Sequence, residues 1–193
     1  MKNAGRIIVG VSGASGAAYA RRALEALRAA GVETHLVISK AAEMAMSYEL
    51  GEKARDFAAL ADHSYAINDV GAPISSGSFR TLGMLIAPCS VRTMSEIATG
   101  VTTSLLTRAA DVVLKERRRL VLMPRESPLH AGHCELMLKA CQLGAIIAPP
   151  MPALYIKPQS IDDLINHSVG RVLDLFDIDV GIVKRWQGPS KAR

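Results

Sequence analysis

Aromatic residues are scarce in this chain of 193 residues, because Phe, Trp and Tyr together make up only 4% of it. The platforms that bind single-stranded nucleic acids stack bases on aromatic side chains, so this scarcity argues against nucleic-acid binding. Charged residues make up 21%, and cations exceed anions to give a formal net charge of +5. An excess of this size suits anionic small ligands as well as nucleic acids, and it does not decide between them.

Cysteine is also sparse, with three residues and no CxxC spacing. A disulfide framework or a zinc ribbon is not expected, and the pattern favours a reducing, cytoplasmic setting. His130, His133 and Cys134 come nearest to a metal motif, but no further ligand is placed beside them. The remaining histidines are scattered along the sequence, so we expect no metal site.

Long apolar segments that could cross a membrane are missing as well. The uncharged run over 7–20 is interrupted by glycine and serine, which favour a turn over a membrane-inserting helix. A second run, over 143–156, is too short to span a bilayer and contains prolines. We therefore expect one domain over residues 1–193, ending in a helix and tail over about 160–193.

Five short apolar runs recur along the chain, each ended by a residue that breaks regular structure. They lack polar alternation, as is typical of strands covered on both faces, and they span 7–11, 34–38, 83–87, 120–123 and 145–148. Helical periodicity is present over 16–30, 103–116 and 160–176. Strands that alternate with helices predict an α/β fold with a doubly wound, mainly parallel sheet.

The loops that follow these strands are rich in hydroxyl groups and small residues. Gly10, Gly13 and Gly16 form a strand-to-helix turn where backbone N–H groups can approach a phosphate, although a glycine-rich turn without a ligand is the alternative. Ser39 and Lys40 follow the second strand, where NAD enzymes usually carry an acidic residue, so a mononucleotide is favoured. Because ligands bind at the carboxyl ends of parallel strands, these loops predict a site for a phosphorylated ligand.

The third strand is followed by a Pro-Cys-Ser-Val-Arg-Thr segment over 88–93. The hydroxyls of Ser90 and Thr93 suit a second phosphate or a ring edge, and simple N-capping of the next helix explains them equally well. Cys89 has no evident base beside it. We expect it to be a small buried residue rather than a nucleophile.

Two carboxylates are candidates for acid–base chemistry. Glu126 follows the fourth strand beside Arg125, and Glu49 lies near a helix end. Burial beside a phosphate would hold such a carboxyl group protonated at neutral pH. Taken alone, Glu49 is equally well a solvated surface residue, and Glu126 is the better candidate. Lys115 ends a helix before a run of arginines, where a solvated helix terminus is the alternative to a functional role.

Taken together, these stretches resemble the UbiX-type flavin prenyltransferases over nearly the whole chain. The resemblance rests on the order and spacing of VGVSGASGA at 9–17, ISKAA at 38–42, ISSGSF at 74–79, PCS at 88–90, RAADVVLKER at 108–117, PRE at 124–126, Tyr155, PQS at 158–160 and RW at 185–186. It implies a flavodoxin-like fold and a homo-dodecamer. It also implies a metal-independent enzyme that joins a dimethylallyl group, from dimethylallyl monophosphate, to reduced FMN. The product, prenylated FMN, would serve a decarboxylase of the UbiD type.

The resemblance also implies roles for individual residues. Those that would hold FMN are Gly13, Ala14, Ser15, Ser39, Ser90, Thr93 and Arg125. Those that would hold the phosphate of dimethylallyl monophosphate are Lys115, Tyr155 and Arg171, with Arg108 contributed across a subunit interface. Glu126 would protonate the departing phosphate. Ser15 and Glu49 would assist proton transfer at the flavin when the second bond closes a ring.

Two rival functions share the fold or the cofactor. Flavin-dependent cysteine decarboxylases carry a catalytic histidine before the third strand and a Pro-x-Met-Asn segment after the fourth. This chain has serines and a glycine over 75–78, and Pro-Arg-Glu over 124–126, at those places. The second rival is a non-catalytic, FMN-binding component of a hydroxyarylic acid decarboxylase complex. A pure binding component of that kind would not need Lys115, Glu126, Tyr155 and Arg171.

Overall fold

All five apolar runs form strands, and a sixth strand that the apolar pattern does not predict joins them at one edge. The computed structural model describes residues 5–186 and 188. Its strands are β1 (Arg6–Val11), β2 (Glu33–Ile38), β3 (His63–Tyr65), β4 (Gly83–Cys89), β5 (Arg119–Pro124) and β6 (Ala145–Ile147). The strands of the runs are apolar because helices cover both faces of the sheet, and every residue of β4 is buried.

The strands form one sheet in the order β3-β2-β1-β4-β5-β6, and all neighbouring pairs are parallel. Without the short edge strand β3, the other five stand in the order second, first, third, fourth, fifth. This is the flavodoxin-like order of a doubly wound sheet, and it confirms the predicted fold class. The strand order reverses between β1 and β4, so the ligand crevice is expected at the carboxyl ends of these two strands.

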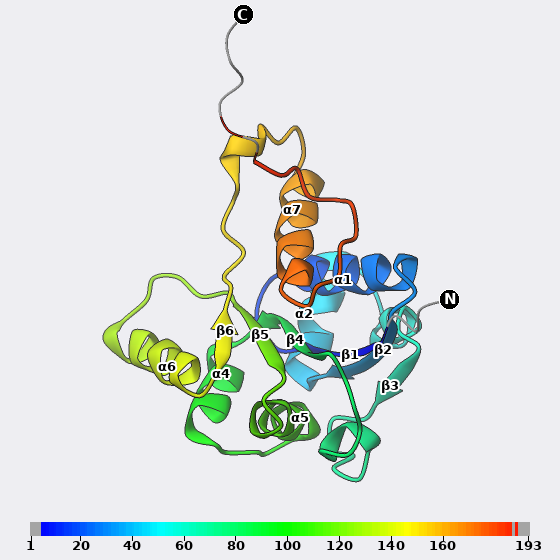
Figure 1. Cartoon of the computed structure of the whole chain (residues 1–193), viewed down its shortest axis with the longest axis vertical. Coiled ribbons are helices and arrows are strands. Elements are labelled where there is room, and N and C mark those ends of the chain that lie inside the picture. Colours follow the sequence, from blue (N-terminus) through cyan, green and yellow to red (C-terminus); the bar gives the residue numbers. More distant parts are fainter. Residues whose placement is uncertain (1–4, 187, 189–193) are drawn as a thin grey trace, which may run out of the picture.

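Helices lie on both sides of the sheet (Figure 1). One side carries α1 (Ala17–Ala29), α2 (Lys40–Leu50) and α7 (Ile161–Asp174), and the other carries α4 (Val91–Thr99), α5 (Leu105–Lys115) and α6 (Ala131–Gln142). Two buried apolar clusters, one on each face, hold these layers to the sheet. The short helices are α3 (Ala54–Ala58), η1 (Pro73–Ser75) and η2 (Leu154–Ile156).

The three predicted helices are all present as α1, α5 and α7. Two of them begin at capping boxes, in which the side chains of Ser104 and Thr107, and of Ser160 and Asp163, each accept a backbone N–H from the other residue of the pair. Lys115 is the last residue of α5, as expected. No helix among residues 5–186 is long and apolar enough to cross a membrane.

The chain after β6 leaves the body of the molecule as an extended segment (Figure 1). It reaches η2 at its outer end, and α7 then returns to pack against α1. We call residues 148–160 the arm. Beyond α7, Arg185 pairs with Asp174 at 3.0 Å and so ties the last described residues to this helix. Of the expected tail, residues 187 and 189–193 lie outside the described residues.

Candidate functional site

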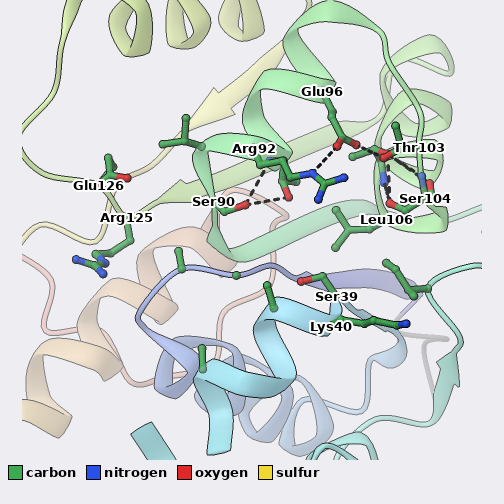
Figure 2. A pocket seen from close by; sticks show the side chains of 18 of the residues that line it. Ser39, Lys40, Ser90, Arg92, Glu96, Thr103, Ser104, Leu106, Arg125 and Glu126 are labelled. Carbon is green, nitrogen blue, oxygen red and sulfur yellow. Dashed lines mark hydrogen bonds and ion pairs between the residues drawn. The ribbon is translucent and has the colours of Figure 1, made fainter. Parts of the chain in front are cut away.

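A cavity of about 780 Å³ opens at the carboxyl edge of the sheet, where the loops after β1, β2, β4 and β5 meet (Figure 2). Its size and its place at the reversal of strand order fit a ligand site of a doubly wound sheet. All seven residues expected to hold FMN line it: Gly13, Ala14, Ser15, Ser39, Ser90, Thr93 and Arg125. Glu126 lines it as well. Their roles stay predictions, but the fold does bring these loops together.

Two helices begin at this cavity, and a serine caps each of them. Ser39 Oγ accepts the backbone N–H of Ala42 at 3.2 Å, and Ser90 Oγ accepts that of Thr93 at 3.2 Å. N-capping therefore explains both serines structurally, yet both also face the cavity. The first N–H groups of α2 and α4 have no partner within their helices, so they can donate to anionic groups in the cavity.

The glycine turn after β1 has a packing explanation. Gly16 has φ +120°, which L side chains rarely adopt, and a Cβ on Gly13 would lie 2.4 Å from the Cβ of Ala41. The first N–H groups of α1 do not face a free phosphate position, because the carboxylate of Glu49 accepts from Gly16 at 2.9 Å and from Ala17 at 2.9 Å. The helix start that the glycine spacing favoured for a phosphate is therefore already occupied by a carboxylate.

Glu49 is therefore an ionised cap rather than a buried acid. Its partial burial alone would raise the pKa of the carboxyl group. Hydrogen bonds from the Ser15 side chain and from the N–H groups of Gly16 and Ala17 outweigh that effect and leave the pKa below its ordinary value. Most of the residue is exposed in the single chain, which agrees with the alternative of a solvated carboxylate rather than a buried, protonated one. Its state suits a proton acceptor.

Glu126 and Arg125 lie together at one end of the cavity, directly after β5 (Figure 2). Both are exposed in the single chain. The Oε1 of Glu126 accepts the N–H of Ser127 at 3.0 Å, which holds the carboxylate near the loop backbone.

Glu96 is a cavity residue that the sequence did not indicate. Its side chain is 14% exposed and pairs with Arg92 at 3.0 Å, and it accepts the hydroxyl of Thr103 at 2.7 Å (Figure 2). Burial would raise its pKa, but these hydrogen bonds and that of Thr107 hold the pKa below the ordinary value. The ionised Glu96 thus fastens α4 to the loop before α5. A lone glutamate inside a helix carries no motif that could have shown this.

The four residues expected to bind the substrate phosphate do not line the cavity of the single chain. Lys115 Nζ lies 2.6 Å from the Oε1 of its neighbour Glu116, at the end of α5. Arg108 pairs with Asp111 at 2.8 Å on the same helix. One chain by itself therefore does not assemble the expected phosphate subsite.

Tyr155 and Arg171 lie near each other, although they come from the arm and from α7. The Oη of Tyr155 is 3.0 Å from Nε2 of His167, which lies one turn before Arg171 on α7. The charge of Arg171 also lowers the pKa of His167, after burial as the main cause. Arg171 itself pairs with Asp174 at 2.7 Å. Tyr155 of the arm and the second half of α7 are thus linked through His167.

Two further expectations can be checked at the level of single residues. Cys89 is fully buried, and this burial raises the pKa of its thiol to about 12, so it is a core residue and not a nucleophile at neutral pH. Although the histidines are scattered along the sequence, two of them lie side by side in the structure. The pairing of β2 with β3 sets His35 directly against His63.

Comparisons of the sequence and the structure with known proteins identify the family of this chain. The family model Flavoprotein matches residues 1–173. A flavin prenyltransferase UbiX of Thauera aromatica is 56% identical over 183 residues, which cover 95% of this chain and 94% of the relative.

Two crystal structures are also close. AnUbiX (PadA1) in complex with FMN and dimethylallyl pyrophosphate has a TM-score of 0.94 and 52% identity, covering 96% of this chain and 98% of that one. A dodecameric FMN-dependent UbiX-like decarboxylase from Escherichia coli O157:H7 has a TM-score of 0.92 and 50% identity, covering 95% and 100%. This chain therefore belongs to the Flavoprotein family and, within it, to the UbiX flavin prenyltransferases.

Proposed function

We propose that this protein transfers a dimethylallyl group from dimethylallyl monophosphate to reduced FMN. The observation that carries the proposal is the cavity at the reversal of strand order. All seven residues expected to hold FMN line this cavity, in a chain that belongs to the UbiX flavin prenyltransferases. The related AnUbiX structure contains dimethylallyl pyrophosphate, whereas the resemblance of the motifs implies the monophosphate. The prenylated product is proposed to serve a decarboxylase of the UbiD type.

The residue types suit the departure of an allylic phosphate. Breaking the carbon–oxygen bond develops positive charge on the allylic carbon and negative charge on the leaving phosphate. The flavin, when bound, supplies an electron-rich ring that can stabilise the first charge and accept the new bonds. The protein stabilises the negative charge on the leaving phosphate. Lys115, Arg171 and the Tyr155 hydroxyl can bind this phosphate, and Glu126 can donate a proton to it. Aromatic side chains are not required, which agrees with their scarcity.

The phosphate subsite is proposed to form between subunits of a homo-oligomer. In one chain the group of Tyr155 and Arg171 belongs to the arm and α7, whereas Glu126 lines the cavity. The arm also exposes apolar side chains, with Met151 72% and Leu154 71% exposed, which suits burial against another copy of the chain. A dodecamer is the assembly we expect, as in the related structure from Escherichia coli O157:H7.

FMN binding should be stoichiometric and independent of metal. We expect one FMN per chain by isothermal titration calorimetry, because each chain has its own cavity lined by all seven residues expected to hold FMN. Ser90→Ala removes a hydroxyl from the cavity and is expected to weaken FMN binding. Prolonged treatment with EDTA should leave both FMN binding and prenyl transfer unchanged. A preparation that loses its activity with EDTA and regains it with a metal would refute the metal-independent reaction.

Sharing of the site between subunits predicts complementation of inactive variants. Glu126→Gln and Tyr155→Phe, each inactive alone, should regain activity when co-expressed, because random assortment leaves roughly one quarter of the sites with both native groups. The matched control pairs Tyr155→Phe with Arg171→Ala, which lie in the same part of one chain and should not complement. Light scattering that finds an active monomer near 20.6 kDa would overturn the shared site.

A further inference from the structure

Three side chains that commonly bind metals meet at the amino edge of the sheet. Glu33 begins β2 and His35 follows two residues later on the same face of the strand, while His63 of β3 is the register partner of His35. Their ligand atoms all lie within 4.8 Å of one another. We propose that Glu33, His35 and His63 form a binding site for a divalent transition-metal ion of the Zn²⁺ type, separate from the FMN cavity.

The distances suit a small ion. Nε2 of His35 lies 3.0 Å from Oε1 of Glu33, and Nε2 of His63 lies 3.4 Å from the same oxygen. Ligand atoms around a tetrahedral Zn²⁺ with bonds near 2.0–2.1 Å are roughly 3.3 Å apart. Two imidazoles and a carboxylate are also a ligand set that Zn²⁺ uses in proteins, with the fourth position left to water.

A supporting hydrogen bond orients the central ligand. Nδ1 of His35 lies 2.9 Å from the Oη of Tyr65, and this bond keeps Nε2 directed toward Glu33. Histidine ligands of metals ordinarily have such a partner on their second nitrogen. His35 is only 2% exposed, and burial lowers its pKa despite the hydrogen bond with Glu33.

Two features of the cluster would have to give way when a metal binds. Arg6 Nε lies 3.5 Å from Oε2 of Glu33, so a cation already shares this carboxylate and only Oε1 is directed to the histidines. The rings of His35 and His63 are nearly parallel, at 15°, so His63 must turn for both nitrogens to point at one ion. Its side chain is half-exposed and has room to turn. An ion-pair cluster without metal is the competing explanation.

Zinc titration separates these explanations. Untagged protein is dialysed against a chelator and titrated with ZnCl₂ by calorimetry, and we expect one strong site per chain. His63→Ala and Glu33→Gln should each weaken binding by about tenfold or more, since even losing an outer partner of a metal ligand costs roughly 10–100-fold. Arg6→Gln should strengthen binding, because it removes the cation that competes for Glu33. Co²⁺ should give the visible absorption of a tetrahedral site.

The matched control is His133→Ala on α6, beside His130 and Cys134, which should bind zinc like the native chain. His63 and Glu33 are partly exposed, so their variants should fold, and prenyl transfer should persist because the cluster lies at the edge opposite the cavity. The proposal is overturned if the native chain has no strong site. It is equally overturned if zinc binding survives both His63→Ala and Glu33→Gln, or is lost in His133→Ala instead.

Discussion

Replacing Glu126 with glutamine is expected to slow phosphate release by about 10²–10⁴-fold while both substrates still bind, the usual cost of losing a positioned acid. Glutamine keeps the size of the side chain and can still donate a hydrogen bond, but it cannot deliver the carboxyl proton. Glu126 lines the cavity directly after β5, beside Arg125, where the family resemblance places the leaving phosphate. The first bond to the flavin should therefore form slowly in this variant.

Rapid-quench measurement of free phosphate, together with FMN titration, tests this expectation. The control is Glu135→Gln on α6, an exposed glutamate that does not line the cavity and whose loss should leave the rate unchanged. If Glu126→Gln released phosphate at the native rate and failed only later, Glu126 would not be the acid of the first step.

Replacing Glu49 with glutamine should have the opposite signature: normal phosphate release, with formation of the ring-closed product slowed by about 10²–10⁴-fold. Glu49 does not line the cavity itself, but it accepts a hydrogen bond from Ser15, which does. It can thus take a proton through Ser15. The fold should survive, because the loss of a charge at a helix N-terminus typically costs about 1 kcal/mol or less.

The lowered pKa of Glu49 determines the pH range in which its carboxylate stays ionised. Because its folded pKa lies below the ordinary value of 4.5, the carboxylate remains ionised as the pH falls to that value and below. Its contribution to stability is present above the unfolded pKa and is lost as the pH falls through the lowered folded pKa. Ring closure should therefore not weaken through protonation of Glu49 between pH 7 and 5.

Quenched samples analysed by mass spectrometry distinguish the two glutamates. Ser15→Ala should behave like Glu49→Gln, because both interrupt the same proton path. Glu43→Gln, on the same helix as Glu49 and exposed, is the matched control and should make the final product at the native rate. A Glu49→Gln enzyme that stalls before phosphate release would contradict the assignment.

The strands could be predicted because burial on both faces leaves an unbroken apolar run, as in β4. The short edge strand β3 escaped prediction, since His63, Ser64 and Tyr65 are polar and partly exposed. The helical periodicity of α2 and α6 was also missed. Their outer faces carry apolar residues such as Tyr48, 85% exposed, and Leu138, 59% exposed, and these obscure the helical period.

The cavity could be predicted because parallel strands bring their carboxyl ends together, so loops distant in sequence become neighbours. The environment of the carboxylates could not be predicted, because it depends on contacts that no sequence pattern indicates. The hydrogen bond from the N–H group of Ala17 to the carboxylate of Glu49 is one such contact. The phosphate subsite was known only through the family resemblance. Lys115 and Tyr155 lie on separate parts of one chain, and no local pattern relates them.

The central claim is prenyl transfer to FMN, and the mass of the flavin product tests it most directly. The purified protein is incubated with FMN, dithionite and dimethylallyl monophosphate, with the pyrophosphate in a parallel sample, and the extracted flavin is analysed by mass spectrometry. We expect a flavin heavier by one five-carbon prenyl unit, formed from the monophosphate in preference. Recovery of unmodified FMN alone, from a protein shown to bind FMN, would contradict the account.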